Sequence, residues 1–197
     1  MFIKDYIIID DALKNPKILQ NMVEELTFYT RFDESLDGLK NIKQRVHKPE
    51  GKWLGFRSQD IYDKSPEIFH LTFNEIFDHV LSDIPCKYEY TLSSYLHFSP
   101  KNCIFDKSQI HEDVDTSFAG VIYLNETPQK NSGTVLYTSD GIVEIENKYN
   151  RLVFYKSQIK HKPASGFGTT TKDSRLTFLF FVTRFFLEFK NNERKKT

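Results

Sequence analysis

Apolar residues in the first part of the chain recur with helical spacing. From about Pro16 to Phe28 they fall three and four positions apart, which predicts an amphipathic helix. A second helix is predicted from Pro66 to about Leu81, because Ser65 offers a capping hydroxyl and a proline suits the first helical position. Its predicted buried face carries Ile68, Phe69, Phe73, Ile76, Phe77 and Val80.

A short strand is predicted ahead of these helices, over Tyr6–Asp10, followed by Asp11 as a candidate helix cap. The hydrophobic pattern changes after residue 87, where residues typical of strands dominate. One long strand is predicted over Tyr88–Phe98, and at least six more before Phe186. The clearest of these runs are Phe118–Asn125, Ser132–Tyr137, Asn150–Tyr155 and Leu176–Val182.

Helices that precede a series of short strands predict a mainly β fold with flanking helices (α+β). The arrangement fits a double-stranded β-helix, which is a cupin-like jelly roll. We expect one domain, because 197 residues form one substantial core but not two. Within it, residues 1–87 would supply helical and substrate-side elements, residues 88–188 the jelly-roll core, and residues 189–197 a flexible tail.

The charge of the chain is balanced, with 27 basic and 27 acidic residues. This balance predicts neither a nucleic-acid partner nor a membrane partner. The start of the chain lacks the basic region and the small-residue cleavage site of a signal peptide, and no apolar run is long enough to cross a membrane. Cys86 and Cys103 do not suggest a disulfide framework. We therefore expect a cytoplasmic protein.

The residues with the clearest chemistry are His111-Glu112-Asp113 and, further along the chain, His161. Two imidazoles and one carboxylate are the ligand set of a non-haem iron(II) that keeps positions open. In a strand, residues two apart point to the same face, so His111 and Asp113 could bind one ion while Glu112 points away. Asp115 shares that parity and is the alternative carboxylate.

Arg175-Leu176-Thr177 follows the second histidine and offers a guanidinium fork beside a hydroxyl group, suited to a carboxylate. The ordered series from about Tyr95 to Phe186 resembles the iron(II)/2-oxoglutarate-dependent dioxygenases, in their prolyl-4-hydroxylase-like branch. The resemblance implies that the metal ligands and catalytic residues are His111, Asp113 and His161. It also implies that the co-substrate is bound by Arg175, Thr177 and Tyr123.

The chemistry implied by this resemblance is the hydroxylation of a small molecule, an amino acid or a peptide. It would use Fe(II), O2 and 2-oxoglutarate, release succinate and CO2, and allow ascorbate as a reductant. Asp113 favours hydroxylation, because halogenating relatives usually lack this acid. The sequence departs from the pattern in the longer separation of His161 from Arg175 and in Phe98, which stands where some relatives carry a second co-substrate tyrosine. The protein would be a monomer or a homodimer.

The substrate side is predicted from a basic segment between Lys40 and Arg57, in which six cationic residues are opposed only by Glu50. We expect this segment to cover the open end of the barrel and to favour an anionic substrate. Trp53 and Arg57 are its best candidates for substrate contact, and His97 could line the same pocket. A solvated surface loop remains the alternative for the segment, as a buried structural role does for His97.

Two other functions remain open at this point. The first is a binding or sensing module that keeps the jelly roll and the metal site without efficient turnover. The second is a zinc hydrolase that uses two histidines and an aspartate. Arg175 and Thr177 argue against the zinc hydrolase, because such a site has no need of a carboxylate clamp there.

Overall fold

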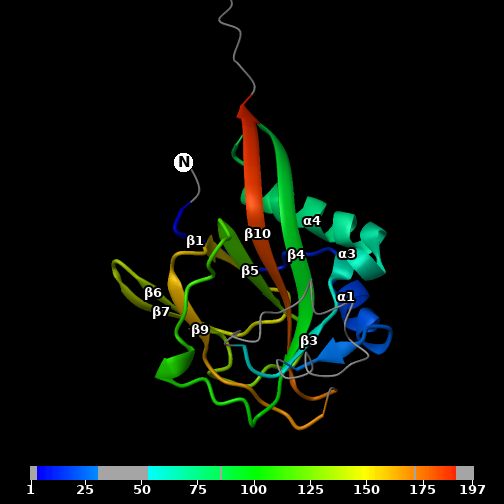
Figure 1. The fold of residues 1–197 in the computed structure, drawn as a ribbon, viewed down its shortest axis with the longest axis vertical. Coiled ribbons are helices and arrows are strands. Elements are labelled where there is room, and N and C mark those ends of the chain that lie inside the picture. Colours follow the sequence, from blue (N-terminus) through cyan, green and yellow to red (C-terminus); the bar gives the residue numbers. More distant parts are fainter. Residues whose placement is uncertain (1–3, 31–52, 85, 171, 190–197) are drawn as a thin grey trace, which may run out of the picture.

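The computed structural model describes residues 4–30, 53–84, 86–170 and 172–189, and these residues form two antiparallel sheets with helices on one side (Figure 1). The first half contains β1 (Tyr6–Ile9), α1 (Lys17–Asn21), η1 (Met22–Glu24), β2 (Phe28–Tyr29), β3 (Phe56–Ser58), α3 (Ile61–Lys64), α4 (Pro66–Val80) and β4 (Cys86–Ser99). The second half contains η4 (Lys107–Gln109), β5 (Phe118–Tyr123), β6 (Thr134–Thr138), β7 (Gly141–Ile145), β8 (Leu152–Lys156), β9 (Lys160–Pro163) and β10 (Arg175–Phe189).

The chain passes back and forth between the two sheets from β4 onward. The large sheet has the strand order β1-β8-β5-β10-β4-β3-β2, and the small sheet has the order β7-β6-β9. Between β4 and β5 the chain touches the small sheet through an isolated bridge that pairs His111 with His161. Strands that alternate between two facing antiparallel sheets form a jelly roll. The fold class predicted from the sequence is therefore confirmed, as are the strands after residue 87.

The helices pack against one face of the large sheet (Figure 1). α4 begins where the sequence predicted, because Ser65 accepts a hydrogen bond from the Ile68 amide and Pro66 occupies the first turn. Its apolar face packs on aromatic side chains of β4 and β10. The buried side chains on this side of the sheet include Phe69, Phe73, Ile76, Phe77, Leu96, Phe98, Phe118, Ile122, Phe154, Phe178 and Phe180.

The first predicted helix is shorter than its apolar spacing suggested. α1 and the 3-10 turn η1 end at Glu24, and the chain becomes extended at Phe28. The predicted strand at the N-terminus is present as β1, but Asp11 does not cap a helix. Asp11 instead has φ of 52°, in the left-handed region that a short polar side chain tolerates at a turn. This part of the sequence prediction is thus partly wrong.

β10 changes which of its residues face the helices. Leu176, Phe178, Phe180 and Val182 belong to the cluster on the helix side of the sheet, and a register shift then falls between Val182 and Arg184. Such an irregularity reverses the parity of a strand, and beyond it Phe185 packs on the Phe77 ring at 5.1 Å between centroids. The shift keeps apolar side chains under α4 along the strand.

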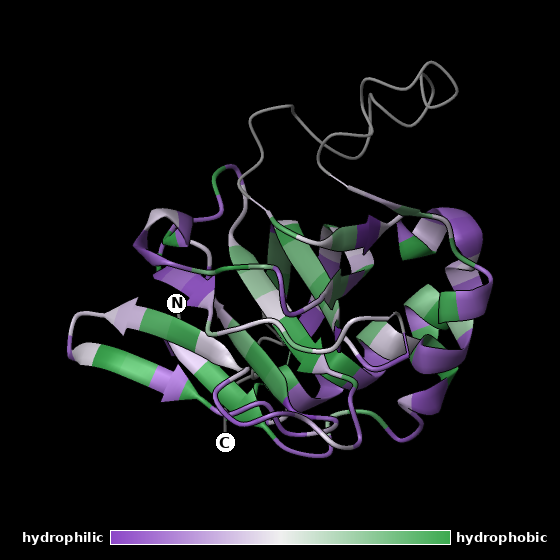
Figure 2. Cartoon of the chain, turned by 90° about the horizontal axis from the view of Figure 1, so that it is seen from below, coloured by the Kyte–Doolittle hydropathy of each residue, from purple (hydrophilic) through white to green (hydrophobic). Residues whose placement is uncertain are grey.

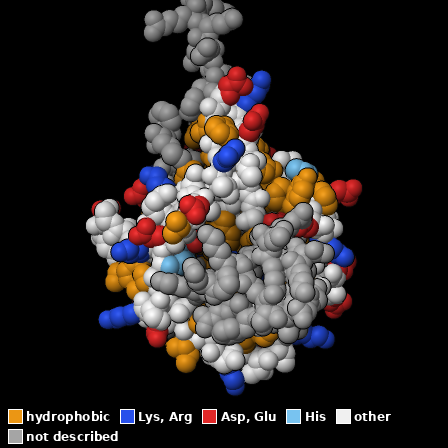
Figure 3. Space-filling view, in the orientation of Figure 1, with side chains coloured by type: hydrophobic (Ala, Val, Ile, Leu, Met, Phe, Trp, Pro, Cys, Tyr) orange, Lys and Arg blue, Asp and Glu red, His pale blue; other side chains and the backbone are white. Residues whose placement is uncertain are grey.

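The opposite face of the large sheet covers the small sheet, with a second apolar cluster between them that includes Val121, Tyr123, Leu136, Ile145 and Val153. Hydrophobic segments concentrate on the strands, whereas the helices and loops carry hydrophilic stretches (Figure 2). Among the described side chains visible in Figure 3, basic and acidic groups are mixed. The proposed flexible tail, from Lys190, lies outside the described residues.

No helix in the described ranges is long and apolar enough to span a membrane.

Candidate metal centre and adjoining cavity

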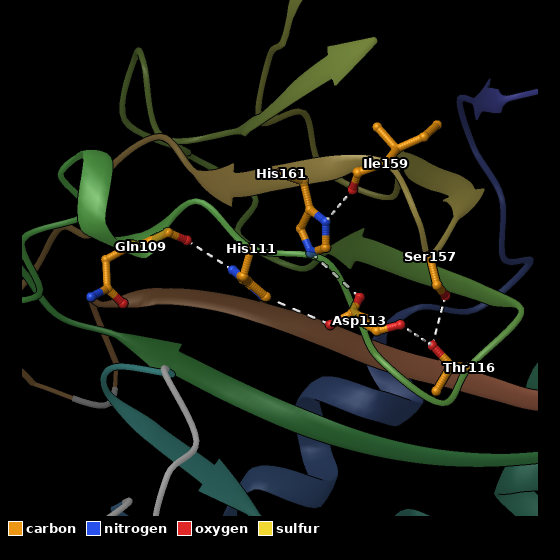
Figure 4. Close-up of polar contacts among 7 residues, drawn as sticks. All are labelled: Gln109, His111, Asp113, Thr116, Ser157, Ile159 and His161. Carbon is orange, nitrogen blue, oxygen red and sulfur yellow. Dashed lines mark hydrogen bonds and ion pairs between the residues drawn. The ribbon is translucent and has the colours of Figure 1, made fainter.

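Three side chains converge at one end of the space between the sheets. The ligand atoms of His111, Asp113 and His161 all lie within 4.8 Å of one another. The two imidazole rings are 4.5 Å apart between centroids, and each directs Nε2 toward the Asp113 carboxylate (Figure 4). The sequence predicted this set, and the structure brings its members together.

The backbone holds the three residues in place by pairing across the small sheet. The amides of His111 and His161 each donate to the other's carbonyl oxygen, at 3.1 and 2.9 Å. The Asp113 amide donates to the Ser157 carbonyl, and Thr116 Oγ1 donates to the Asp113 carbonyl (Figure 4). The expected continuous strand is therefore absent, because Asp113 lies in an irregular segment fixed by these bonds.

The structure also separates the two candidate carboxylates. Asp115 has φ of 67° and an exposed side chain, and it lies outside the cluster. The side chain of Asp113, in contrast, is only 12% exposed. The left-handed turn at Asp115 breaks the strand parity on which the alternative depended.

Both histidines direct Nε2 toward the centre of the cluster, while Nδ1 is engaged by the backbone. Nδ1 of His111 donates to the Gln109 carbonyl at 2.8 Å, and Nδ1 of His161 donates to the Ile159 carbonyl at 2.9 Å (Figure 4). A carbonyl oxygen can only accept, so Nδ1 carries the proton in each ring. Burial lowers the pKa of His161 below its usual range, which favours the neutral, metal-binding form.

The donor set fits a divalent metal ion. Oδ2 of Asp113 is buried and accepts no hydrogen bond from the described residues. The Nε2 atoms lie 3.7 Å (His111) and 3.4 Å (His161) from the carboxylate oxygens, beyond ordinary hydrogen-bond length. A cation between them would satisfy all three acceptors, and two imidazoles with one carboxylate are the ligands of non-haem Fe(II) sites.

Arg175 and the three candidate ligands line the same cavity. This cavity has a volume of about 440 Å³. Arg175 is only 2% exposed. Its Nε donates to the Ser132 carbonyl at 2.6 Å, and Nη2 to the Gly133 carbonyl at 3.3 Å. No carboxylate in the described part of the chain pairs with it. Burial lowers its pKa, because the charged form is desolvated and no described carboxylate pairs with it.

The other two predicted co-substrate residues lie next to Arg175 but behind the cavity wall. The Tyr123 ring is 5.6 Å from the Arg175 guanidinium carbon, and its hydroxyl donates to Thr134 Oγ1 at 2.7 Å. Thr177 Oγ1 donates to the His97 carbonyl at 3.4 Å. Neither Tyr123 nor Thr177 is among the residues that line the cavity, whereas Thr134 is.

Trp53, Arg57 and His97, the predicted substrate residues, line the same cavity as the metal cluster. Most of the basic segment, from Lys40 to Lys52, lies outside the described residues. His97 is buried, and its Nε2 donates to the Leu54 carbonyl at 2.6 Å. His97 therefore also has the structural role that the sequence left open, since it fixes the segment that carries Trp53.

Sequence reasoning assigned no role at the site to Thr134 or Tyr155. The Tyr155 ring packs on the His161 ring with 4.8 Å between centroids, and both tyrosine and threonine line the cavity. The alternation of inward and outward residues along the strand at 152–156 was the available signal for Tyr155. Thr134 lies in the predicted strand Ser132–Tyr137, so the same alternation was the available signal for it.

No protein-family model and no curated protein sequence matches the chain. Solved structures do match its fold. A prolyl-4-hydroxylase from Pseudomonas putida has a TM-score of 0.50 and 14% identity, over 91% of this chain and 92% of that one. HygX from Streptomyces hygroscopicus, solved with nickel, 2-oxoglutarate and hygromycin B, has a TM-score of 0.55 and 8% identity, over 91% and 83%. EctD from S. alaskensis, solved with 2-oxoglutarate and 5-hydroxyectoine, has a TM-score of 0.55 and 15% identity, over 93% and 72%.

These likenesses establish that the chain shares the jelly-roll fold of structures that include 2-oxoglutarate-dependent oxygenases. Because the sequence identities are low, these structural likenesses show a shared fold and nothing about function.

Proposed function

We propose that this protein is an Fe(II)/2-oxoglutarate-dependent dioxygenase that hydroxylates a small molecule, an amino acid or a peptide side chain. It would convert 2-oxoglutarate and O2 to succinate and CO2. The observation that carries the proposal is the presence, in one cavity, of a His-Asp-His cluster and a buried arginine that pairs with no described carboxylate. The first suits iron(II), and the second suits the far carboxylate of a dicarboxylic acid.

Iron(II) would be held by His111, Asp113 and His161. When bound, it supplies the oxygen chemistry that couples decarboxylation of 2-oxoglutarate to oxidation of the substrate. The protein's part is to fix the ligands: the Nδ1–H bonds to Gln109 and Ile159 orient both rings. Three protein ligands leave positions open on an octahedral ion for co-substrate and oxygen.

2-Oxoglutarate would be oriented by Arg175, whose guanidinium can bind a carboxylate through two parallel hydrogen bonds. Its bonds to the Ser132 and Gly133 carbonyls fix the side chain without neutralising its charge. Burial raises the pKa of Tyr123, so its hydroxyl stays protonated beside Arg175 and can act as a donor. We assign Tyr123 and Thr177 supporting roles, with Thr134 as the hydroxyl that lines the cavity.

The test is anaerobic addition of iron(II) and 2-oxoglutarate to the full chain, followed by visible spectroscopy. A metal-to-ligand charge-transfer band that needs both components is expected. Succinate is then measured after admission of air, with ascorbate present as reductant. A band without succinate formation would favour a binding or sensing module, whereas zinc content with hydrolytic activity and no band would favour the hydrolase.

A further inference from the structure

A second arginine in the cavity is surrounded by aromatic rings. The Arg57 guanidinium carbon lies 5.0 Å from the centroid of the Trp53 ring, 5.3 Å from that of Tyr95 and 5.5 Å from that of Phe181. The rings come from the segment before β3, from β4 and from β10. Rings at these distances hold a cation by its attraction to their π faces and leave its edge for hydrogen bonds.

No carboxylate of the described residues lies within ion-pair distance of Arg57, and Asp113 acts on its charge only from further away. The Arg57 Nε is out of contact with solvent and has no hydrogen-bond partner within the described ranges. Desolvation lowers the pKa of Arg57 to about 10, which leaves the group cationic at neutral pH. A buried donor without a partner and a cation without a counter-ion are both unfavourable, and an anion that accepts from Arg57 would relieve both.

Arg57 and Arg175 occupy different parts of the cavity. On β4, Arg57 pairs with His97, and Arg175 pairs with Ser99 near the strand end. The Arg57 guanidinium lies over Tyr95 and Phe181, further along the strands from Ser99, while that of Arg175 reaches Ser132 and Gly133. The two guanidinium groups therefore lie at different positions along the strands, and a 2-oxoglutarate carboxylate bound at Arg175 would leave Arg57 available to a second carboxylate.

The segment from Trp53 to Arg57 is held in a fixed conformation against β4. Gly55 has φ of 97°, and a Cβ there would lie 2.1 Å from the Phe98 carbonyl oxygen, so only glycine fits. This close approach lets the Leu54 carbonyl accept from His97 Nε2, and Trp53 packs edge-on against the His97 ring at 6.1 Å. A fixed aromatic wall with one cation is suited to orienting a ligand.

We propose that Arg57 binds the carboxylate of the oxidised substrate, which is a small acid with a single negative charge. This inference rests on the proposed function and names its substrate class. Two arginines and a divalent metal, set against Asp113 and dianionic 2-oxoglutarate, leave one positive charge in the loaded cavity. A monocarboxylate neutralises it. Glu112 also lines the cavity, but its side chain is exposed and its charge is screened by water.

The experiment compares acids with their uncharged amides. The probes are benzoate and benzamide, and N-acetyl-L-leucine and N-acetyl-L-phenylalanine, each with its primary amide. Binding is measured by calorimetry on the full chain with iron(II) and saturating 2-oxoglutarate, without oxygen. Inorganic phosphate tests a different anion, and a pentapeptide ending in leucine tests whether the carboxylate can come from a chain terminus.

At least one acid should bind wild-type protein about tenfold or more tightly than its amide, which is the range for a hydrogen bond to a charged group. Arg57→Gln should remove this preference, and Arg57→Lys should keep part of it, because the charge remains but the planar fork is lost. Arg184→Gln, at an exposed arginine of β10, is the matched control and should change nothing. The affinity for 2-oxoglutarate should stay the same in Arg57→Gln.

The proposal is overturned if no acid is preferred to its amide, if the preference survives in Arg57→Gln, or if phosphate binds more tightly than every acid. Should Arg57→Gln fail to fold, as judged by thermal unfolding, the Arg57→Lys variant decides. Failure of the proposed function shows separately, as a missing iron–2-oxoglutarate band in the wild type. The acid and amide titrations, repeated without metal, would still test Arg57 in that case.

Discussion

The two faces of the large sheet are formed by alternate residues of the same strands. One face packs against the helices, and the other lines the cavity. On β10, Leu176, Phe178 and Phe180 face α4 within a cluster of buried aliphatic and aromatic side chains. Their neighbour Arg175 faces the cavity, and on β4 Tyr95 and His97 do the same, between residues that face the helices. One face is filled by hydrocarbon, and the other leaves a cavity lined by charged and polar groups.

Residues that stabilise the fold therefore alternate along the same strands with residues that line the cavity. The helix-facing side chains stabilise the fold by burying apolar surface. The cavity-facing arginines are desolvated and form no ion pair with the described residues, which costs stability in the absence of a ligand. Substitutions on the helix side should therefore lower the free energy of unfolding. Substitutions on the cavity side should instead weaken ligand binding with little loss of stability.

The largest effect is expected from the metal ligands on the cavity side. Asp113→Ala, His111→Ala and His161→Ala should each abolish iron-dependent succinate formation, because each removes one of three protein ligands. The free energy of unfolding should change by less than about 1 kcal/mol, since these positions lie outside the apolar core. Iron content and the anaerobic band report binding, and chemical denaturation reports stability.

Asp115→Ala is the matched control for the carboxylate, because Asp115 is exposed and outside the cluster. It should keep iron binding and turnover. Full activity in Asp113→Ala together with loss in Asp115→Ala would show that the wrong carboxylate was chosen.

On the helix side, Phe73→Ala should lower the free energy of unfolding by about 3–5 kcal/mol. Phe73 is fully buried, and its ring contacts those of Phe178 and Phe180 at 5.7 and 5.1 Å. The fraction of folded protein that binds iron should stay unchanged. Leu71→Ala, at a 60% exposed site of the same helix, should change stability by no more than about 0.5 kcal/mol. Equal losses in the two variants would contradict the assignment of this face.

Arg175→Ala should raise the 2-oxoglutarate requirement by well over tenfold, because losing a charge-assisted pair in a closed pocket costs about 2–5 kcal/mol. Iron binding in the absence of 2-oxoglutarate should persist, since Arg175 is not a metal ligand. Succinate formation against co-substrate concentration measures the effect, with Arg184→Ala as the exposed control. An unchanged requirement would remove the co-substrate role of this arginine.

The smallest effect tests a carboxylate on the helix side. Asp60 caps α3 by accepting from the Tyr62 amide, and burial raises its pKa from 3.8 to about 6. The folded state then holds this proton more tightly than the unfolded state, so stability falls as pH rises from about 4 to 6. The fall should total about 1–2 kcal/mol, since the group is partly solvated.

Asp60→Asn keeps the cap and removes the titration, so its stability should lack this part of the pH dependence. Denaturant unfolding of both proteins at several pH values between 4 and 7 provides the comparison. Parallel stability curves for variant and wild type would show that Asp60 does not titrate in this range.

The sequence was most informative where local chemistry decides the structure. Ser65 and Pro66 start α4, and its periodic phenylalanines face the core, as predicted. It was less informative for short elements: α3 has four residues, which is too short for a periodic signal. The helix predicted over 16–28 was too long, because the chain turns at Glu25 and β2 begins at Phe28.

The candidate site divides in the same way. The types and order of His111, Asp113, His161 and Arg175 could be recognised in the sequence, and the structure brings them to one cavity. The three rings around Arg57, from Trp53, Tyr95 and Phe181, could not be predicted, because they come from three separate segments. Only the register of β3 on β4 and of β4 on β10 places those rings around one side chain.

The central position of β10 also bears on how the protein folds. β10 lies between β5 and β4 and pairs with both, over residues far apart in the sequence. Pairing of this kind closes long loops, so we expect folding on the order of milliseconds to seconds. Until β10 is inserted, β4 and β5 expose unpaired edges that can recruit other chains. The strand that carries Arg175 is thus also the one whose late arrival would leave the nascent sheet open to aggregation.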